Sequence, residues 1–183
     1  PLGLMYIASY LRDKLDEFDI RILDSRVKDL SFEEIEEYLK DYQPEYIGIT
    51  SMHVDSPELH KVAQMSKSIV RDPVVIVGGP YPTSGYKQVM EDMNIDFCVV
   101  GEGEIPFAEL MKALRYGLGY ENIRNVAFRL NGEMVYNGSR ELISDLDSIP
   151  LPAWDLIDMN DYFYGKKRSL ENPVQIHKRA VSI

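Results

Sequence analysis

The sequence predicts an α/β fold built on a mostly parallel sheet. Residues 74–77 and 97–100 form continuously apolar runs, as expected of strands that are covered on both faces. Amphipathic segments of helical length separate the apolar runs, which is the order that βαβ crossovers require. The chain has 183 residues, of which 45% are hydrophobic and 27% charged, the balance of a globular domain large enough to bury a core.

The elements of the first fifty residues follow from the spacing of apolar side chains. Residues 4–15 carry these side chains at helical intervals and predict a helix, and the short apolar run at 20–23 predicts a strand. Ser31 followed by Glu34 forms a capping box, so a second helix is expected directly after it. The apolar run at 46–50 predicts the next strand.

Proline and serine mark the helix starts in the middle of the chain. Ser56 is expected to cap a helix that has Pro57 at its first position. A weaker helix is expected over residues 86–93. After the last buried strand, Pro106 stands near the start of a helix that ends near Gly117.

The two ends of the chain depart from this alternation. Residues 126–136 have the pattern of a hairpin, because Asn131-Gly132 between two apolar runs favours a type I′ turn. Beyond Ser139, prolines and aspartates predict an extended connector. Residues 1–3 have the character of a loop without its preceding strand, and a sheet that lacks this strand would leave backbone groups unpaired. We therefore expect truncation at both ends.

Charge and cysteine content exclude several classes of function. A net charge of −10 disfavours contact with phosphate backbones, so no nucleic-acid partner is expected. No apolar run has the length of a membrane span, and no membrane partner is expected. Cys98 is the single cysteine, which indicates a reducing, cytoplasmic location, and its apolar neighbours predict a core position. The few histidines lack metal-ligand spacing, so no metal site is expected.

The loops that follow the predicted strands are the candidate binding site. In open parallel sheets, ligands bind beyond the carboxyl ends of the strands. Glycines there let the backbone approach a flat or elongated ligand, and hydroxyl groups can bond its polar tail. No catalytic residue is expected among them. The candidate ligand-binding residues are Asp24, Arg26, Thr50, Ser51, Met52, Gly78, Gly79, Pro80, Gly101, Glu102 and Gly103.

Four segments, taken in order, resemble a known family. They are PLGLMYIASYL at 1–11, VGGPYPT at 77–83, VGEGE at 100–104 and LDSIPLPAW at 146–154. Together they resemble the cobalamin-binding domain of radical S-adenosylmethionine enzymes, a group that includes the anaerobic magnesium-protoporphyrin ester oxidative cyclases and many methyltransferases. The resemblance covers nearly the whole chain. It implies a flavodoxin-like (Rossmann-like) three-layer sandwich, with the hairpin and connector added at its C-terminal side.

The resemblance also assigns roles to the candidate residues. Cobalamin would lie across the strand ends, with its nucleotide tail buried beside the sheet. Ser51 matches the serine that faces the tail, and Gly78 and Gly79 match the glycine pair that makes room for it. The loop 101–103 would flank the same slot.

One position departs from the wider cobalamin-binding pattern. The methionine synthase type carries an Asp-x-His-x-x-Gly motif whose histidine ligates cobalt, whereas residues 24–29 place Arg26 at that position. Arginine is protonated and has no free lone pair, so it cannot coordinate cobalt. An unligated lower face would favour methyl transfer. His53 is the alternative ligand, although a polar loop role is expected of it more often.

The resemblance implies a division of the parent polypeptide. Residues 1–120 would form the cobalamin-binding domain, 121–138 a hairpin extension, and 139–183 a linker toward a C-terminal radical S-adenosylmethionine domain. The 4Fe-4S cluster and S-adenosylmethionine would belong to that domain, because the Cys-x-x-x-Cys-x-x-Cys run is not found here and is expected after a strand beginning at 180–183. The parent reaction would be methyl transfer or a cobalamin-assisted radical cyclisation or rearrangement, and this fragment alone would not be catalytic.

Two alternatives remain open. A phospho-receiver domain shares the flavodoxin-like fold but needs an aspartate at the end of its central strand, where this chain has Thr50-Ser51. A cobalamin-free interaction module of the same fold is the other, since a fold does not fix a function.

Overall fold

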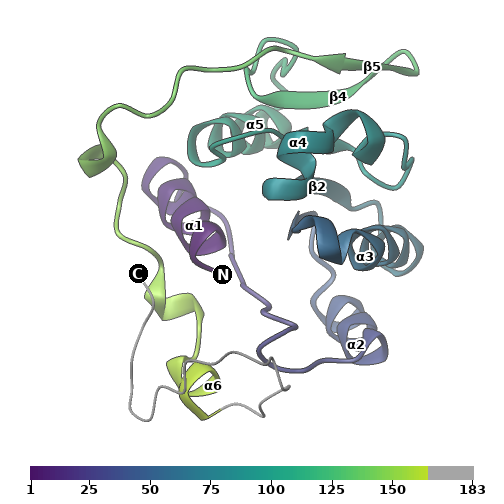
Figure 1. The fold of residues 1–183 in the computed structure, drawn as a ribbon, viewed down its shortest axis with the longest axis vertical. Helices are drawn as coiled ribbons and strands as arrows, with labels where there is room; N and C mark the ends of the chain where they lie inside the picture. The colour runs from purple at the N-terminus through teal and green to yellow at the C-terminus, as the bar shows by residue number, and fades with distance from the viewer. Residues whose placement is uncertain (165–183) are drawn as a thin grey trace.

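Five strands form one sheet in the computed structural model, which describes residues 1–164 (Figure 1). The strand order is β1-β2-β3-β4-β5. Strands β1 (Tyr46–Thr50), β2 (Val74–Gly78) and β3 (Phe97–Val99) are parallel. Strands β4 (Val126–Leu130) and β5 (Glu133–Tyr136) are antiparallel to their neighbours. The predicted α/β fold is confirmed, with three parallel strands among the five.

Helices cover both faces of the sheet. Helices α1 (Leu2–Lys14) and α5 (Glu104–Tyr116) pack on one face, where their apolar residues share a core with alternate residues of β2, β3 and β4. Helices α3 (Ser56–Ile69) and α4 (Pro80–Val89) pack on the other face, and α2 (Phe32–Tyr42) packs beside α3. Strands β2 and β3 lie between these two layers and are largely buried, which explains their continuously apolar sequences.

The predicted hairpin is confirmed, and it continues the main sheet. Asn131 and Gly132 have φ angles of 53° and 85°, the two positive values that a type I′ turn requires. The register pairs Phe128 with Phe97 of β3 on one side and with Val135 on the other. Phe128 is fully buried, so the hairpin contributes directly to the core.

Two of the predicted helix starts can be compared with the structure. The capping box is confirmed, because the Ser31 hydroxyl accepts a bond of 3.2 Å from the Glu34 amide while the Glu34 carboxylate accepts one of 2.7 Å from the Ser31 amide. The predicted cap at Ser56 is wrong. Ser56 is the first residue of α3 and Asp55 holds the cap position, since the short 3-10 helix His53–Asp55 leads directly into the helix.

The helix predicted over residues 86–93 lies earlier in the chain. Helix α4 begins at Pro80, directly after Gly79, whose φ is 100°. Proline is favoured at the first helical position because its φ is already fixed near the helical value. The helical spacing of apolar residues was therefore a weaker signal than the glycine–proline pair.

The strand predicted at 20–23 is wrong. This segment is extended, but it has no ladder partner among the described residues and is not part of the sheet. A strand exists only where a neighbour completes its hydrogen bonds, so apolar β-branched sequence alone does not form one.

The segment after β5 returns along α1 to the short helix α6 (Met159–Tyr164), as Figure 1 shows. The Ala153 amide donates to the Met5 carbonyl at 3.1 Å, and the Ser9 hydroxyl donates to the Leu151 carbonyl at 2.6 Å. This connector is therefore held against α1 by one backbone–backbone hydrogen bond and one from the Ser9 side chain. The strand expected from residue 180 onward lies outside the described residues.

In the described part of the chain, none of the helices combines the length and the apolar composition that crossing a membrane requires.

Candidate functional site

The loops after β1 and β2 are in direct contact. The Ser51 amide donates to the Gly78 carbonyl at 3.2 Å, and the Tyr81 amide donates to the Ser51 carbonyl at 3.1 Å. A Cβ atom at Gly79 would lie 2.7 Å from the Thr50 hydroxyl oxygen and 3.0 Å from the Ser51 carbonyl oxygen. Only glycine permits this close approach of two backbones. Gly79 therefore positions the loop that carries Thr50 and Ser51.

The loop after β3 joins the same cluster. The Gly101 amide donates to the Thr83 hydroxyl at 3.0 Å, and the Thr83 amide donates to the Gly79 carbonyl at 3.0 Å. Thr83 thus links the second loop to the third. The Glu102 carboxylate accepts a bond of 2.8 Å from the Ile143 amide, so it fixes the connector rather than pointing freely into a site.

Asp24 and Arg26 lie at the edge of this cluster. The Arg26 guanidinium forms an ion pair with Asp55, which follows β1 and the 3-10 helix. Asp24 accepts the Val27 amide at 3.0 Å and the Tyr162 hydroxyl at 2.8 Å. Burial, together with the bond to Asp24, raises the pKa of the Tyr162 phenol, which remains a neutral donor. Asp24 is therefore committed to local structure, whereas Arg26 remains half-exposed.

The remaining candidates divide between the interior and the surface. Gly103 faces inward, since a Cβ there would lie 3.0 Å from the Cδ1 atom of Ile7. Pro80 begins α4. Met52 is 56% exposed, and Val54, which the sequence analysis did not single out, is 79% exposed. The exposed position of Val54 could have been suspected from the sequence, because it is a single apolar residue between the polar residues His53 and Asp55.

His53 has partners that account for its position. Its ring packs edge-on against Tyr81 with centroids 5.1 Å apart, and its Nε2 lies 3.3 Å from the Ser84 hydroxyl. The Tyr81 phenol also lies 3.4 Å from Nε2 of His60, whose Nδ1 is 2.7 Å from an Asp92 carboxylate oxygen. Burial acts to raise the pKa of Asp92, but hydrogen bonds from the Asn94 backbone and from the His60 ring hold it below its ordinary value. This polar chain joins residues far apart in sequence, and spacing gave no sign of it.

The cluster fits the shape and chemistry of a corrinoid in three respects. A Cβ at Gly78 would have the Val99 carbonyl oxygen, at an ordinary contact distance of 3.8 Å, as its nearest neighbour, so no side chain of the protein crowds this glycine. Met52 and Val54 present apolar surface of the kind that a tetrapyrrole face covers. Ser51 is 5% exposed, and its hydroxyl donates to the Met52 carbonyl, which leaves its lone pairs able to accept a bond.

Comparison with known proteins identifies the family. Residues 1–111 match the family model described as the B12 binding domain, which is more than half of the chain. An uncharacterized methyltransferase of Pyrococcus horikoshii is 36% identical over 163 residues, which cover 88% of this chain and 35% of that protein. The anaerobic magnesium-protoporphyrin IX monomethyl ester cyclase of Synechocystis is 28% identical over 177 residues, 93% of this chain and 34% of the cyclase. The chain thus spans about a third of the length of these relatives.

Solved structures agree on the fold. The cobalamin-dependent S-adenosylmethionine radical enzyme OxsB, with aqua-cobalamin and S-adenosylmethionine bound, superposes with a TM-score of 0.71 at 21% identity, over 85% of this chain and 22% of the enzyme. The radical S-adenosylmethionine methyltransferase TsrM of Kitasatospora setae superposes with a TM-score of 0.66 at 18% identity, over 82% of this chain and 28% of the enzyme. The family match together with this fold confirms the resemblance predicted from the sequence: the chain belongs to the B12 binding domain family.

Proposed function

We propose that the chain binds cobalamin across the carboxyl ends of β1, β2 and β3 and serves as the cobalamin-binding domain of a radical S-adenosylmethionine enzyme. The observation that carries this proposal is the hydrogen-bonded contact among the three loops after these strands, with no side chain crowding Gly78. Ligands of open parallel sheets bind in this position. Membership of the B12 binding domain family gives the chemical class of the ligand.

Four of the candidate residues have a proposed part in holding the cofactor. Gly78 leaves room for the nucleotide tail, Ser51 accepts a bond from it, and Met52 lies against the corrin. Gly79 acts indirectly, through its contact with the loop of Ser51. Bound cobalamin supplies the cobalt-centred chemistry, while these residues bind it and exclude water.

The lower face of the corrin is proposed to lack a nitrogen ligand from the protein. Arg26 stands where a ligating histidine would be, and it is paired with Asp55. A guanidinium has no lone pair to donate. The test is the electron paramagnetic resonance spectrum of the bound cobalt(II) form, which we expect to show no nitrogen coupling from the protein. Nitrogen coupling that disappears in His53→Gln would assign the ligand to His53 and contradict this part of the proposal.

The parent protein is proposed to extend beyond this chain. We assign residues 1–120 to the cobalamin-binding domain, 121–138 to the hairpin extension and 139–183 to a linker. The 4Fe-4S cluster and S-adenosylmethionine are assigned to a C-terminal domain of the same polypeptide, and methyl transfer or radical cyclisation to the assembled enzyme. The names of the relatives, which are methyltransferases and cyclases, support this assignment, and the single cysteine supports a cytoplasmic location.

Titration with hydroxocobalamin tests the proposal. The purified chain should retain one equivalent of corrinoid after dialysis, with a shifted visible spectrum. Gly78→Ala should weaken binding by roughly fivefold or more, because a methyl group forced into a filled slot costs about 1–3 kcal/mol. Gly48→Ala, in the middle of β1, is the matched control and should bind normally. A folded chain that retains no corrinoid would instead support the interaction module.

A further inference from the structure

Asn125, directly before β4, is a buried polar residue with an unused hydrogen-bond donor. Apart from tyrosine, the buried polar residues within 1–164 are Ser51, Ser66 and Asn125. The two serine hydroxyls donate to the carbonyls of Met52 and Val62, each at 2.8 Å. The side-chain nitrogen of Asn125, Nδ2, has no acceptor anywhere in that range of the chain.

The direction of the Asn125 side-chain amide is fixed by its neighbours. Its oxygen, Oδ1, accepts a bond of 2.7 Å from the Arg140 backbone amide. Only oxygen can accept this bond, so the amide group cannot be turned around and Nδ2 lies on the other side. The backbone of Asn125 is also held, because its amide donates to Gly138 and its carbonyl accepts from Val100, both at 2.8 Å.

Nδ2 faces the loop after β3. A Cβ atom at Gly101 would have Nδ2, at 3.6 Å, as its nearest neighbour. Because glycine has no Cβ, this side of the amide stays uncovered. Within the described chain, every fully enclosed side-chain nitrogen or oxygen has a partner. Nδ2 has none and therefore reaches the surface, although Asn125 as a whole is only 7% exposed.

The local structure explains the other parts of Asn125. Its φ of 65° favours asparagine or glycine over other residues. The bond from Arg140 uses Oδ1. Neither feature requires the Nδ2 donor. When a ligand covers an amide donor and displaces its water, the donor needs a new acceptor, since an unmade bond costs free energy.

The sheet places Asn125 at the edge that holds the candidate site. Gly78 ends β2, the loop of Gly101 follows β3, and Asn125 precedes β4, the next strand in the sheet. Neighbouring strands are about 4.8 Å apart, so Asn125 lies on the order of 10 Å from Gly78 along this edge. Its donor therefore borders the loop that flanks the proposed slot for the nucleotide tail.

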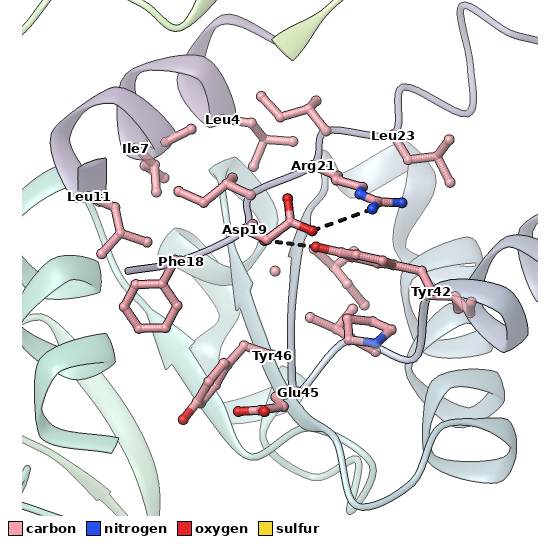
Figure 2. A pocket seen from close by; sticks show the side chains of 18 of the residues that line it. Leu4, Ile7, Leu11, Phe18, Asp19, Arg21, Leu23, Tyr42, Glu45 and Tyr46 are labelled. Atoms are coloured by element: carbon pink, nitrogen blue, oxygen red, sulfur yellow. Dashed lines mark hydrogen bonds and ion pairs between the residues drawn. The ribbon is translucent and has the colours of Figure 1, made fainter. Parts of the chain in front are cut away.

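The groove beside β1 offers no comparable donor among the described residues. Figure 2 shows this groove, which has a volume of about 560 Å³. Two of its polar side chains are engaged with Asp19: Arg21 pairs with the carboxylate at 3.4 Å, and the Tyr42 hydroxyl donates to the backbone carbonyl at 2.7 Å. None of the three buried polar residues named above lines the groove.

We propose that Nδ2 of Asn125 donates a hydrogen bond to an oxygen of the sugar–phosphate part of the nucleotide tail of cobalamin. Asn125 thereby selects complete cobalamin over cobinamide, which has the same corrin ring but lacks the nucleotide. This inference rests on the proposed function. The acceptor is assigned to the tail because Nδ2 lies beside Gly101, whose loop flanks the slot of the tail.

The substitution Asn125→Asp tests the proposal. Aspartate keeps an acceptor for the Arg140 amide and tolerates a positive φ, but an oxygen replaces the Nδ2 donor. We expect the affinity for hydroxocobalamin to fall about tenfold or more. The affinity for aquocobinamide should change less than about twofold. Equal losses for the two corrinoids, or no loss for hydroxocobalamin, would overturn the proposal.

The substitution Asn131→Asp is the matched control. Asn131 also has a positive φ, of 53°, but it is exposed and lies at the other end of β4. The change of charge is the same, and Asp-Gly suits the same turn. Both affinities should stay within about twofold of the parent chain. A loss as large as that of Asn125→Asp would assign the effect to the added charge and overturn the proposal.

A measurement on the unmodified chain keeps the test decisive if Asn125→Asp fails to fold. The NMR signals of the Asn125 side-chain amide should shift on addition of hydroxocobalamin and stay unchanged on addition of cobinamide. Signals that do not move with hydroxocobalamin would overturn the proposal. Normal retention of hydroxocobalamin without these effects would contradict only the role of Asn125. No retention by the unmodified chain would contradict the proposed function and this inference with it.

Discussion

The substitution Gly79→Ala tests most directly whether the loops after β1 and β2 need a glycine at position 79 for their close contact. Gly79 has a φ of 100° and a ψ of −172°, a combination that is essentially restricted to glycine. The added methyl group would also meet the Thr50 hydroxyl oxygen at 2.7 Å and the Ser51 backbone at 3.0 and 3.2 Å. Because two of these neighbours are backbone atoms, relief requires a shift of the loop after β1.

The expected loss of stability follows from these two terms. Holding a non-glycine residue in this region costs about 1–3 kcal/mol. Forcing a methyl group into a filled space costs about 1–3 kcal/mol more. Together they lower the free energy of unfolding by roughly 2–6 kcal/mol, a large part of a typical total. For a chain of this length, that corresponds to a fall of roughly 4–24 °C in Tm.

Urea unfolding of Gly79→Ala and Gly78→Ala, followed by circular dichroism, measures the difference. Gly78 is the matched control, because its added Cβ would meet only the Val99 carbonyl oxygen at an ordinary 3.8 Å and its φ is not positive. Gly78→Ala should therefore stay within about 1 kcal/mol of the parent chain. Equal stabilities of the two variants would refute the claim that Gly79 is required by close backbone contact.

Three other substitutions or measurements probe separate parts of the fold. Arg129→Met removes guanidinium hydrogen bonds to three carbonyl groups and should lower the free energy of unfolding, measured in urea, by about 2–4 kcal/mol. Arg124→Met, the control, loses one exposed bond and should lower it by less than about 1 kcal/mol. Burial raises the pKa of the Cys98 thiol to about 12, so the folded chain should resist alkylation at pH 8 and react once unfolded; rapid labelling of the folded chain would contradict this. The lowered pKa of Asp92 means that the hydrogen bonds which its carboxylate accepts from the Asn94 backbone and the His60 ring stabilise the fold above the ordinary pKa of 3.8, and this stabilisation is lost as the pH falls through the folded value. Asp92→Asn should therefore cost about 1 kcal/mol at pH 7 and little in acid, and a cost independent of pH would refute the assignment.

Signals within short stretches of sequence predicted most of the fold correctly. The buried strands, the capping box at Ser31 and the turn at Asn131 each depend on neighbouring residues, and the structure has all of them. The error at 20–23 has a different cause, because a strand depends on a partner that composition does not reveal. The start of α4 was misplaced because helical spacing was weighed above the backbone requirement of Gly79 and Pro80.

The candidate site was predictable to the level of loops. Parallel strands bring their carboxyl ends to one edge, so glycines and hydroxyls after successive strands could be grouped in advance. The contacts that join the loops could not, because they link residues far apart in sequence, such as Arg26 with Asp55 and Gly101 with Thr83. Side-chain direction decides such pairs, and it depends on the packed structure.

The hydrogen bond between Tyr162 and Asp24 has a consequence for assembly. It brings residue 162 beside the rim where we place the corrin, although the connector has travelled from the opposite end of the sheet (Figure 1). The last described residues of the proposed linker therefore lie beside the proposed corrin site, on the path from the hairpin toward a C-terminal domain.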